Sequence, residues 1–239
     1  MRPTDVAERY LDLLERVLTR YDLDGGDLEV RREGRDHPET AETMIGLDRL
    51  HSLRGAVETV VREGVPGDLV ETGVWRGGAC ILMRAVLAAL GDEERTVWVA
   101  DSFEGLPKPS GKYPADEGDP LWSWEHLAVS EDDVRANFAR YGLLDDQVRF
   151  LVGWFADTLP DAPIERLALM RLDGDMYEST IDALEALYPR LSPGGYVIVD
   201  DFGGPAGCRP AVEDFRRAHG IDDPIEVVDW TCVMWRRGS

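Results

Sequence analysis

The sequence contains few cysteines, few basic residues and no long apolar segment. Its three cysteines, Cys80, Cys208 and Cys232, lie far apart and form no CxxC pair. Their number and spacing argue against a disulfide framework, a thiolate metal site or a redox motif. No run of about 18 apolar residues is present, so we expect no transmembrane helix, and the first residues lack the apolar core of a signal peptide. These absences favour a cytoplasmic protein with reduced thiols.

Basic residues are scarce relative to acidic ones. The chain has 26 Lys and Arg against 47 Asp and Glu, which gives a formal net charge of −21. Nucleic acids and anionic membranes are bound by clustered Lys and Arg, so we expect neither as a partner. Hydrophobic residues make up 44% of the 239 residues, enough for a sizeable core, and this length fits one large α/β domain.

Two short apolar runs stop abruptly in acids: Asp173 and Asp175 follow the first, and Asp200 and Asp201 follow the second. Both runs are apolar on both faces, as is typical of buried parallel strands. Ligands bind outside the carboxyl ends of such strands, so neighbouring strands would bring these carboxylates together. So many anions require either protonation or a bound cation, and oxygen ligands suit Mg²⁺ or Ca²⁺ rather than zinc. The alternative is that Asp173 and Asp201 merely cap the following helices.

A glycine-rich turn lies between an expected strand and an expected helix near residue 75. Its glycines do not follow the dinucleotide pattern GxGxxG. Glu71, just before the turn, would repel a pyrophosphate and favour a ligand with an ammonium group or sugar hydroxyls. Asp101 ends the next expected strand, where an acid can accept hydrogen bonds from a ribose, although it could instead cap a helix.

Hydrophobic periodicity predicts strands and helices in alternation, preceded by two helices and closed by a hairpin. We expect an α/β fold with a doubly wound sheet of about seven strands, in a single domain over residues 1–239. Residues 1–66 would be N-terminal helices and an arm, and residues 67–239 the core. The expected strands are 68–72, 96–102, 148–153, 167–172, one ending at 200, 226–228 and 232–235. The expected helices are 6–21, 43–63, 79–90, 129–141, 180–191 and 209–218.

The N-terminal region carries two further signals. Residues 22–38 are polar and charged and contain glycine, so we expect a loop or mobile segment there, with Arg31 and Arg32 on a solvated surface. The helix before it has an apolar stripe that the sheet does not need. We expect this stripe to contact a partner subunit in a homo-oligomer; the alternative is that it packs on its own domain.

A long polar stretch, residues 108–126, separates the second strand from the next helix and is called the lid below. It is rich in Pro, Gly and Asp and contains Tyr113, Trp122 and Trp124. Loops of this length in a compact domain are usually functional, and the aromatic residues suggest that it covers an organic substrate. His126, at its end, is a candidate base because the pKa of histidine suits proton transfer, although a lone histidine is usually not catalytic.

Five sequence blocks resemble those of the macrocin and mycinamicin O-methyltransferases of the TylF type. The blocks are Thr43-Met-Ile-Gly, Glu71-Thr-Gly-Val-Trp-Arg-Gly-Gly, Asp101-Ser-Phe-Glu-Gly-Leu-Pro, Leu172-Asp-Gly-Asp-Met-Tyr-Glu-Ser-Thr and Val199-Asp-Asp-Phe-Gly. The resemblance covers about residues 35–235. It implies a Rossmann-like class I methyltransferase that depends on S-adenosylmethionine and a divalent metal. It also implies methylation of sugar hydroxyls on macrolides and other natural products.

The resemblance assigns cofactor contacts residue by residue. The turn of residues 71–78 would hold the methionine part of S-adenosylmethionine, Asp101 its ribose, and residues 154–157 its adenine. The arm, residues 35–45, would close over cofactor and substrate. The cofactor-binding residues implied are Thr43, Met44, Glu71, Thr72, Gly73, Arg76, Gly77, Asp101, Ser102, Trp154, Phe155, Asp157 and Asp173. Arg76 could instead lie on the surface.

The same resemblance implies that Asp173, Asp200 and Asp201 bind Mg²⁺ and that Asp175 is the general base. Related catechol-type enzymes use a lysine near the first metal ligand, and this chain has none there, so an acid must serve. His126, at the end of the lid, is the rival base. A metal that chelates two neighbouring oxygens lowers the pKa of a hydroxyl, which suggests a vicinal diol in a glycosylated small-molecule acceptor.

Two other functions are compatible with the acids. A metal-dependent hydrolase or phosphatase could use the same aspartates, although no GxxxxGK[ST] phosphate loop is present. A regulatory module that only binds the cofactor would leave the paired acids without a use. The identity of the acceptor stays open.

Overall fold

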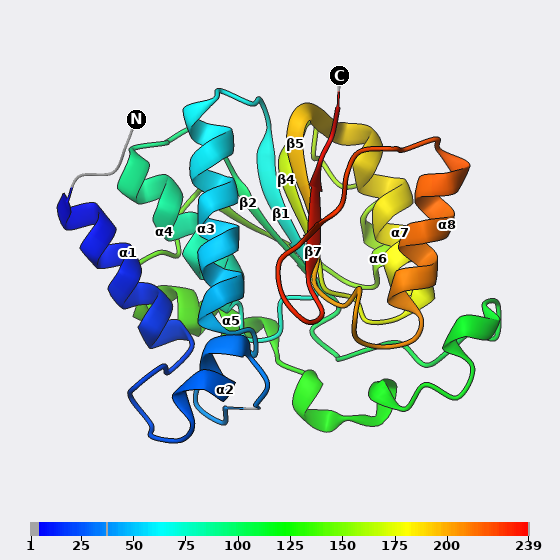
Figure 1. Cartoon of the computed structure of the whole chain (residues 1–239), viewed down its shortest axis with the longest axis horizontal. Coiled ribbons are helices and arrows are strands. Elements are labelled where there is room, and N and C mark those ends of the chain that lie inside the picture. The colour runs from blue at the N-terminus through cyan, green and yellow to red at the C-terminus, as the bar shows by residue number, and fades with distance from the viewer. Residues whose placement is uncertain (1–4, 37, 239) are drawn as a thin grey trace.

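A seven-stranded sheet forms the centre of the computed structural model, which describes residues 5–36 and 38–238 (Figure 1). The strand order is β3-β2-β1-β4-β5-β7-β6. The bounds are β1 Asp68–Thr72, β2 Val97–Asp101, β3 Val148–Val152, β4 Leu167–Leu172, β5 Leu191–Val199, β6 Glu226–Val227 and β7 Val233–Arg236. The first five strands are parallel, and β7 runs antiparallel to both β5 and β6. The expected doubly wound sheet and its closing hairpin are therefore confirmed.

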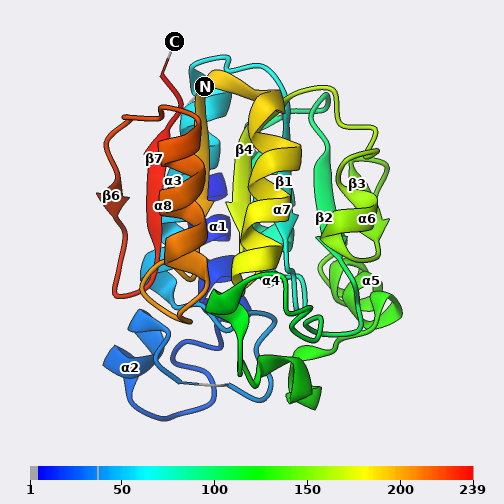
Figure 2. The same cartoon turned by 90° about the vertical axis from the view of Figure 1, so that its right-hand side faces the viewer.

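Helices cover both faces of the sheet (Figure 2). They are α1 Asp5–Leu18, α2 Leu28–Glu33, α3 Leu47–Arg62, α4 Gly78–Leu90, α5 Glu131–Arg140, α6 Phe155–Thr158, α7 Tyr177–Leu187 and α8 Cys208–Ala218. Short 3₁₀ turns occur at η1 Pro114–Asp116, η2 Leu121–Ser123, η3 Glu125–Leu127 and η4 Tyr188–Arg190. None of the helices within the described ranges is long and apolar enough to cross a membrane.

Two apolar cores lie on opposite faces of the sheet. Side chains alternate along a strand, so Leu69 of β1 packs with α1, α3, α4 and α5, while its neighbour Val70 packs with α7 and α8. Both side chains are fully buried. Burial on both faces explains why the central strands read as continuous apolar runs.

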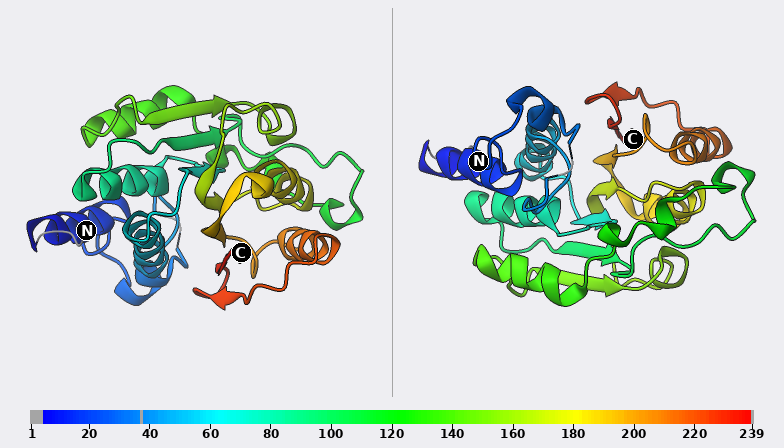
Figure 3. Two further views of the ribbon diagram at one scale, coloured as in Figure 1. Left: turned by 90° about the horizontal axis from the view of Figure 1, so that it is seen from above. Right: turned by 90° about the horizontal axis from the view of Figure 1, so that it is seen from below.

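The order in which successive strands are added to the sheet changes direction between the neighbouring strands β1 and β4. Strands β2 and β3 continue to one side of β1, whereas β4 and β5 lie on the other. At such a point the connections that leave the carboxyl ends diverge and open a crevice. The lid and the N-terminal segment around α2 both lie at this edge of the sheet, below it in Figure 1 and facing the viewer in the right panel of Figure 3.

The N-terminal region differs from the expectation in two places. The stretch 22–38, one position of which lies outside the described residues, contains helix α2, which Asp27 caps through the amide of Glu29 at 2.9 Å. Arg31 is 5% exposed rather than solvated, and its Nη2 donates to the carbonyls of Met44 at 2.7 Å and Ile45 at 2.8 Å. These bonds hold the backbone before Leu47 out of helical geometry, so α3 begins four residues later than the expected helix (47 − 43).

Candidate active site

Three carboxylates converge beyond the ends of β4 and β5. One oxygen each of Asp173, Asp175 and Asp201 lies within 4.8 Å of the others. The two strands are paired in register at Leu172 and Val199, so the residues that follow reach the same edge. Asp175 adopts a left-handed backbone conformation (φ 58°), and its amide donates to Oδ2 of Asp201 at 3.1 Å. This bend turns the chain back toward the cluster directly after the strand.

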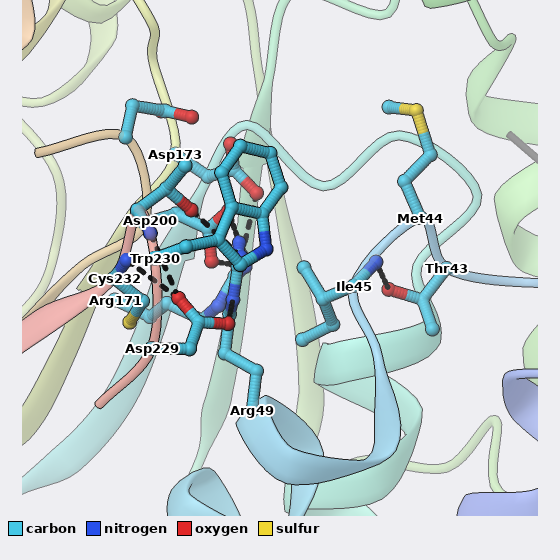
Figure 4. A network of polar contacts seen from close by, with 12 residues as sticks. Thr43, Met44, Ile45, Arg49, Arg171, Asp173, Asp200, Asp229, Trp230 and Cys232 are labelled. Atoms are coloured by element: carbon cyan, nitrogen blue, oxygen red, sulfur yellow. Dashed lines mark hydrogen bonds and ion pairs between the residues drawn. The ribbon is translucent and has the colours of Figure 1, made fainter. Parts of the chain in front are cut away.

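Asp200 lies apart from this group, which differs from the expected trio of Asp173, Asp200 and Asp201. Its carboxylate contacts Arg171 of β4 and Arg49 of α3 (Figure 4). Both residues follow the last residue of β5, and in this structure the carboxylate of Asp200 faces the two arginines whereas that of Asp201 faces Asp175. The structure brings Asp175 beside Asp173 and Asp201 instead.

Two buried arginines lie behind the cluster. Arg171 is 1% exposed and donates to Glu71, to Asp200 and, at 2.8 Å, to Asp173. Arg49 donates through Nε to Asp229 at 2.8 Å. Buried charges are costly unless they are paired, so this network compensates acids that would otherwise repel one another.

Sequence reasoning missed both arginines and their partner Asp229. The available signal for Arg171 was a charged residue in the middle of an otherwise apolar strand. For Arg49 the signal was absent, because its partners lie 151 and 180 residues away in the chain.

The cluster carries more negative charge than its surroundings neutralise. Burial, together with neighbouring acids, raises the pKa of Asp173 to about 6 and that of Asp175 to about 8. Burial and the charges of Asp175 and Asp173 raise the pKa of Asp201 well above its usual value. A bound cation would relieve this repulsion, and closely spaced carboxylates are the donors that Mg²⁺ and Ca²⁺ prefer. The donor set therefore fits a hard divalent cation.

The glycine-rich turn after β1 packs directly against the first acid of the cluster. A Cβ at Gly73 (φ 80°) would lie 1.7 Å from the carbonyl oxygen of Asp173, so only glycine fits there. Asp101, at the end of β2, accepts from the amide of Val74 at 2.7 Å and from that of Phe103 at 2.7 Å. Its carboxylate thus fixes the turns after β1 and β2 relative to each other, and burial raises its pKa.

A cavity of about 230 Å³ opens between these turns, α6 and the lid. Its lining includes eight of the residues expected from the sequence to serve the cofactor, metal or chemistry: Met44, Gly73, Asp101, Ser102, Trp154, Phe155, Asp173 and Asp175. It also includes residues that were not expected, among them Trp75, Gly105, Leu106, Leu127, Gly174 and Ser179. All of these except Leu127 lie within the sequence blocks of the resemblance, and Trp75 belongs to the turn of residues 71–78 that was expected to hold the methionine part of the cofactor, although it was not singled out.

Other expected residues lie around this cavity rather than in its lining. Glu71 is buried against Arg171, and Thr43 and Thr72 are buried as well. Gly77 precedes the first residue of α4, and Asp157 lies on α6. Arg76 donates through Nη1 to the carbonyls of Glu39 at 2.6 Å and Ala41 at 2.9 Å, so it holds the arm against the turn.

Hydrogen bonds attach the lid to α7 and to the glycine-rich turn, and Ser110 Oγ donates to Glu178 of α7 at 2.6 Å. Asp116 is 2% exposed, and its carboxylate accepts from the amides of Tyr177 at 2.7 Å and Glu178 at 3.0 Å. It therefore caps α7, whose own N-cap residue makes no side-chain capping bond. At the other end, Nε1 of Trp75 donates to the carbonyl of His126 at 2.9 Å. His126 lines a second cavity that also borders Trp75, and the cluster of acids does not include it.

Comparison with known proteins adds a family match. The model of the macrocin-O-methyltransferase (TylF) family matches residues 23–237. The chain is 57% identical to the 8-demethyl-8-(2,3-dimethoxy-alpha-L-rhamnosyl)-tetracenomycin-C 4'-O-methyltransferase of Streptomyces olivaceus, over 97% of this chain and 94% of that protein. It is 49% identical to the mycinamicin III 3''-O-methyltransferase of Micromonospora griseorubida over the full length of both.

Solved structures show the same relationship. The O-methyltransferase NovP superposes with a TM-score of 0.94 at 51% identity, over 98% of this chain and all of that chain. A calicheamicin methyltransferase superposes with a TM-score of 0.65 at 20% identity, over all of this chain and 95% of that chain, which shows the fold alone.

Proposed function

The chain belongs to the macrocin-O-methyltransferase family, and we propose that it transfers a methyl group from S-adenosylmethionine to a sugar hydroxyl of a glycosylated natural product, with a divalent cation. That the chain is an O-methyltransferase follows from its close relatives and its structural neighbour NovP. The donor, the cation and the acceptor are the proposed part.

One observation carries the proposal. Asp173 and Asp175 lie in the lining of the same cavity as Gly73 and Asp101, so the group of acids and the turns after β1 and β2 share one space. A site for a cation and a base therefore lies next to a site for an organic cofactor. Neither a hydrolase nor a regulatory module needs this combination.

The residues around the cavity fit S-adenosylmethionine. Gly73 lines the cavity, where the lack of a side chain lets the backbone approach a ligand. Asp101 accepts from two amides and, at 3.5 Å, from the Ser102 hydroxyl, which leaves a lone pair for a ribose hydroxyl. Trp154 and Phe155 offer aromatic faces at the far wall. When bound, S-adenosylmethionine would supply an electrophilic methyl group on its sulfonium, which transfers to an oxygen nucleophile while S-adenosylhomocysteine leaves.

We assign the cation to Asp173, Asp200 and Asp201 and the proton transfer to Asp175. Two guanidinium groups hold Asp200 rigidly, which suits a ligand, and its oxygens retain lone pairs beyond these contacts. Asp175 lines the cavity, where it can accept the proton of the acceptor hydroxyl. Mg²⁺ bound there would lower the pKa of a chelated hydroxyl.

The names of two relatives support a sugar hydroxyl as the acceptor. One is named for 4'-O-methylation of a rhamnosyl-bearing tetracenomycin, and another for 3''-O-methylation of mycinamicin III. A sugar with two neighbouring oxygens could bind the cation through both of them, which favours a vicinal diol. We further propose that the chain forms a homodimer through the exposed face of α1.

The test is methyl transfer by the purified chain. We expect a rhamnosylated acceptor to gain one methyl group by mass spectrometry when S-adenosylmethionine and Mg²⁺ are present, and no product after chelation. S-adenosylhomocysteine should raise the melting temperature with or without Mg²⁺. Cleavage of the acceptor or release of phosphate, without methylation, would instead support a metal-dependent hydrolase.

A further inference from the structure

A second cavity, of about 620 Å³, adjoins the first. The arm, the glycine-rich turn and the lid each contribute to its walls: Glu39, Met44, Trp75, Arg76, Trp124 and His126. Met44 and Trp75 line both cavities, so these two side chains form a shared wall. The volume lies within the range of about 300–1,000 Å³ that is usual for small-molecule sites.

The second cavity is called the outer cavity below, and the first is called the inner cavity. Aromatic rings dominate the outer cavity. Trp124 and His126 stack with their ring centroids 5.6 Å apart and an interplanar angle of 28°. The guanidinium of Arg76 lies 4.2 Å from the centroid of the Trp75 ring. Among the described residues, the lining combines three aromatic rings with Pro38, Met44 and the charged side chains of Arg76 and Glu39, and none of these residues carries an aliphatic hydroxyl or an amide side chain.

Hydrogen bonds connect the three segments that surround this cavity. Trp75 has a left-handed backbone (φ 48°), which is costly for a bulky residue and persists only where the surroundings enforce it. Its Nε1 is bonded to the carbonyl of His126, and Arg76 is bonded to the carbonyl of Glu39. The turn next to the inner cavity thus positions both the lid and the arm around the outer one.

We propose that the outer cavity binds the aglycone of the acceptor and that this aglycone is a planar, hydroxylated aromatic ring system. Its sugar would pass between Met44 and Trp75 toward Asp175. Flat rings stack on tryptophan and histidine, and phenolic oxygens can meet Arg76 at the margin. Glu39 and Arg76 are the charged groups that the described part of this wall offers, and its aromatic rings favour a flat ring system over a sugar. The inference rests on the proposed function, because only a glycosylated acceptor would occupy both cavities.

The lid supplies a matched pair of residues for the test. Trp124 lines the cavity and is 43% exposed, whereas Trp122 does not line it and is 44% exposed. Trp122 instead lies beside Lys108, whose Nζ is 5.2 Å from the ring centroid. Removal of either ring costs similar exposed apolar surface, so only Trp124→Ala should affect an aglycone in the cavity.

The experiment measures binding of a sugar-free, hydroxylated four-ring aromatic compound by calorimetry, in the presence of S-adenosylhomocysteine. We expect Trp124→Ala to weaken binding about tenfold, Trp124→Phe to restore most of it and Trp122→Ala to change it less than twofold. In methyl transfer to the matching glycoside, Trp124→Ala should raise KM and leave kcat nearly unchanged.

The outcomes separate this inference from the proposed function. If the chain methylates the glycoside but Trp124→Ala and Trp122→Ala weaken binding equally, the aglycone assignment is overturned. It is also overturned if Trp124→Ala raises KM for a glycosylated non-aromatic macrocycle as much as for the aromatic glycoside. If no methyl transfer occurs but the sugar-free compound binds with the same dependence on Trp124, the cavity assignment holds and the proposed function fails. Failure of Trp124→Phe to restore binding by a folded protein also overturns the inference.

Discussion

Arg171, buried within β4, donates a hydrogen bond to Asp173, the first acid of the cluster, at 2.8 Å. The same guanidinium contacts Glu71 of β1 and Asp200 after β5. One cation thus joins acids from three adjacent strands (Figure 4). Its removal would leave these carboxylates buried without their shared partner.

We expect Arg171→Met to lower the free energy of unfolding by about 3–5 kcal/mol, the usual cost of breaking a buried ion pair from one side. Arg149→Met is the matched control, because Arg149 is exposed on the edge strand β3 and should change stability by no more than ~0.5 kcal/mol. Urea denaturation with a chelator present measures both. Equal stabilities for the two variants would show that the network contributes little.

The convergence of the acids could be predicted, but their partners could not. Parallel strands end at one edge, so Asp173 and Asp201 were expected to meet once β4 and β5 were taken as neighbours. Which acid joins them depends on the left-handed backbone at Asp175. No local signal in the sequence indicates that conformation, because non-glycine residues seldom adopt it.

Most features of the site that the sequence did not predict depend on contacts between residues far apart in the chain. The pairing of Arg49 with Asp200 requires α3 to pack next to the end of β5, which periodicity alone does not specify. Helix α2 is a different case: Asp27 before it and Gly34 after it are ordinary cap residues, so this short helix was readable and was missed.

We expect Asp101→Ala to weaken S-adenosylhomocysteine binding by ~1.5–3 kcal/mol. It removes a charged acceptor from the cavity and also frees the amides of Val74 and Phe103. Asp146→Ala, an exposed acid before β3, serves as the control. Calorimetry that shows unchanged affinity for the Asp101 variant would remove this residue from the cofactor site.

Asp116 attaches the lid to α7, so its loss should affect the lid before the rest of the fold. We expect Asp116→Ala to lower the free energy of unfolding by about 0.5–2 kcal/mol, the value of a helix cap, and to speed proteolysis within residues 108–126. The neighbouring Glu117→Ala, on an exposed side chain, should do neither. Identical cleavage rates for the two variants would contradict a role of Asp116 in attaching the lid.

The exposed apolar face of helix α1 allows a test of the proposed homodimer. Leu11, Leu14 and Leu18 pack into the chain's own core, but Val6 and Leu13 stay 76% and 56% exposed. We expect sedimentation to give twice the chain mass of 26.7 kDa at micromolar concentration. Leu13→Glu should yield a monomer, because it places a charge in the exposed apolar face.

The matched control for this prediction is Val227→Glu, since Val227 is also exposed, at 76%, but lies on the edge strand β6, whereas α1 packs on α3 and α4. This variant should remain a dimer. A monomeric parent chain would show that the stripe of α1 serves only its own fold.

The assignments of cation and base can be separated by two substitutions. Asp200→Asn should raise the Mg²⁺ concentration needed for half-maximal activity, because a carboxylate ligand becomes neutral. Asp175→Asn should leave Mg²⁺ and cofactor binding nearly intact and lower kcat by about 10²–10⁴, the usual contribution of a general base. Steady-state kinetics over a Mg²⁺ series, with calorimetry of the cofactor, measures both.

The opposite pattern would also be informative, since the structure groups Asp175 rather than Asp200 with Asp173 and Asp201. If Asp175→Asn raises the Mg²⁺ requirement and Asp200→Asn does not, Asp175 is a ligand and Asp200 serves only its two arginines. If Asp175→Asn keeps near-full turnover that chelation still abolishes, the base lies elsewhere, and His126→Ala is the next variant to measure. Activity that survives exhaustive chelation would exclude the cation, and the raised pKa values of the acids would then mean that the cluster is partly protonated.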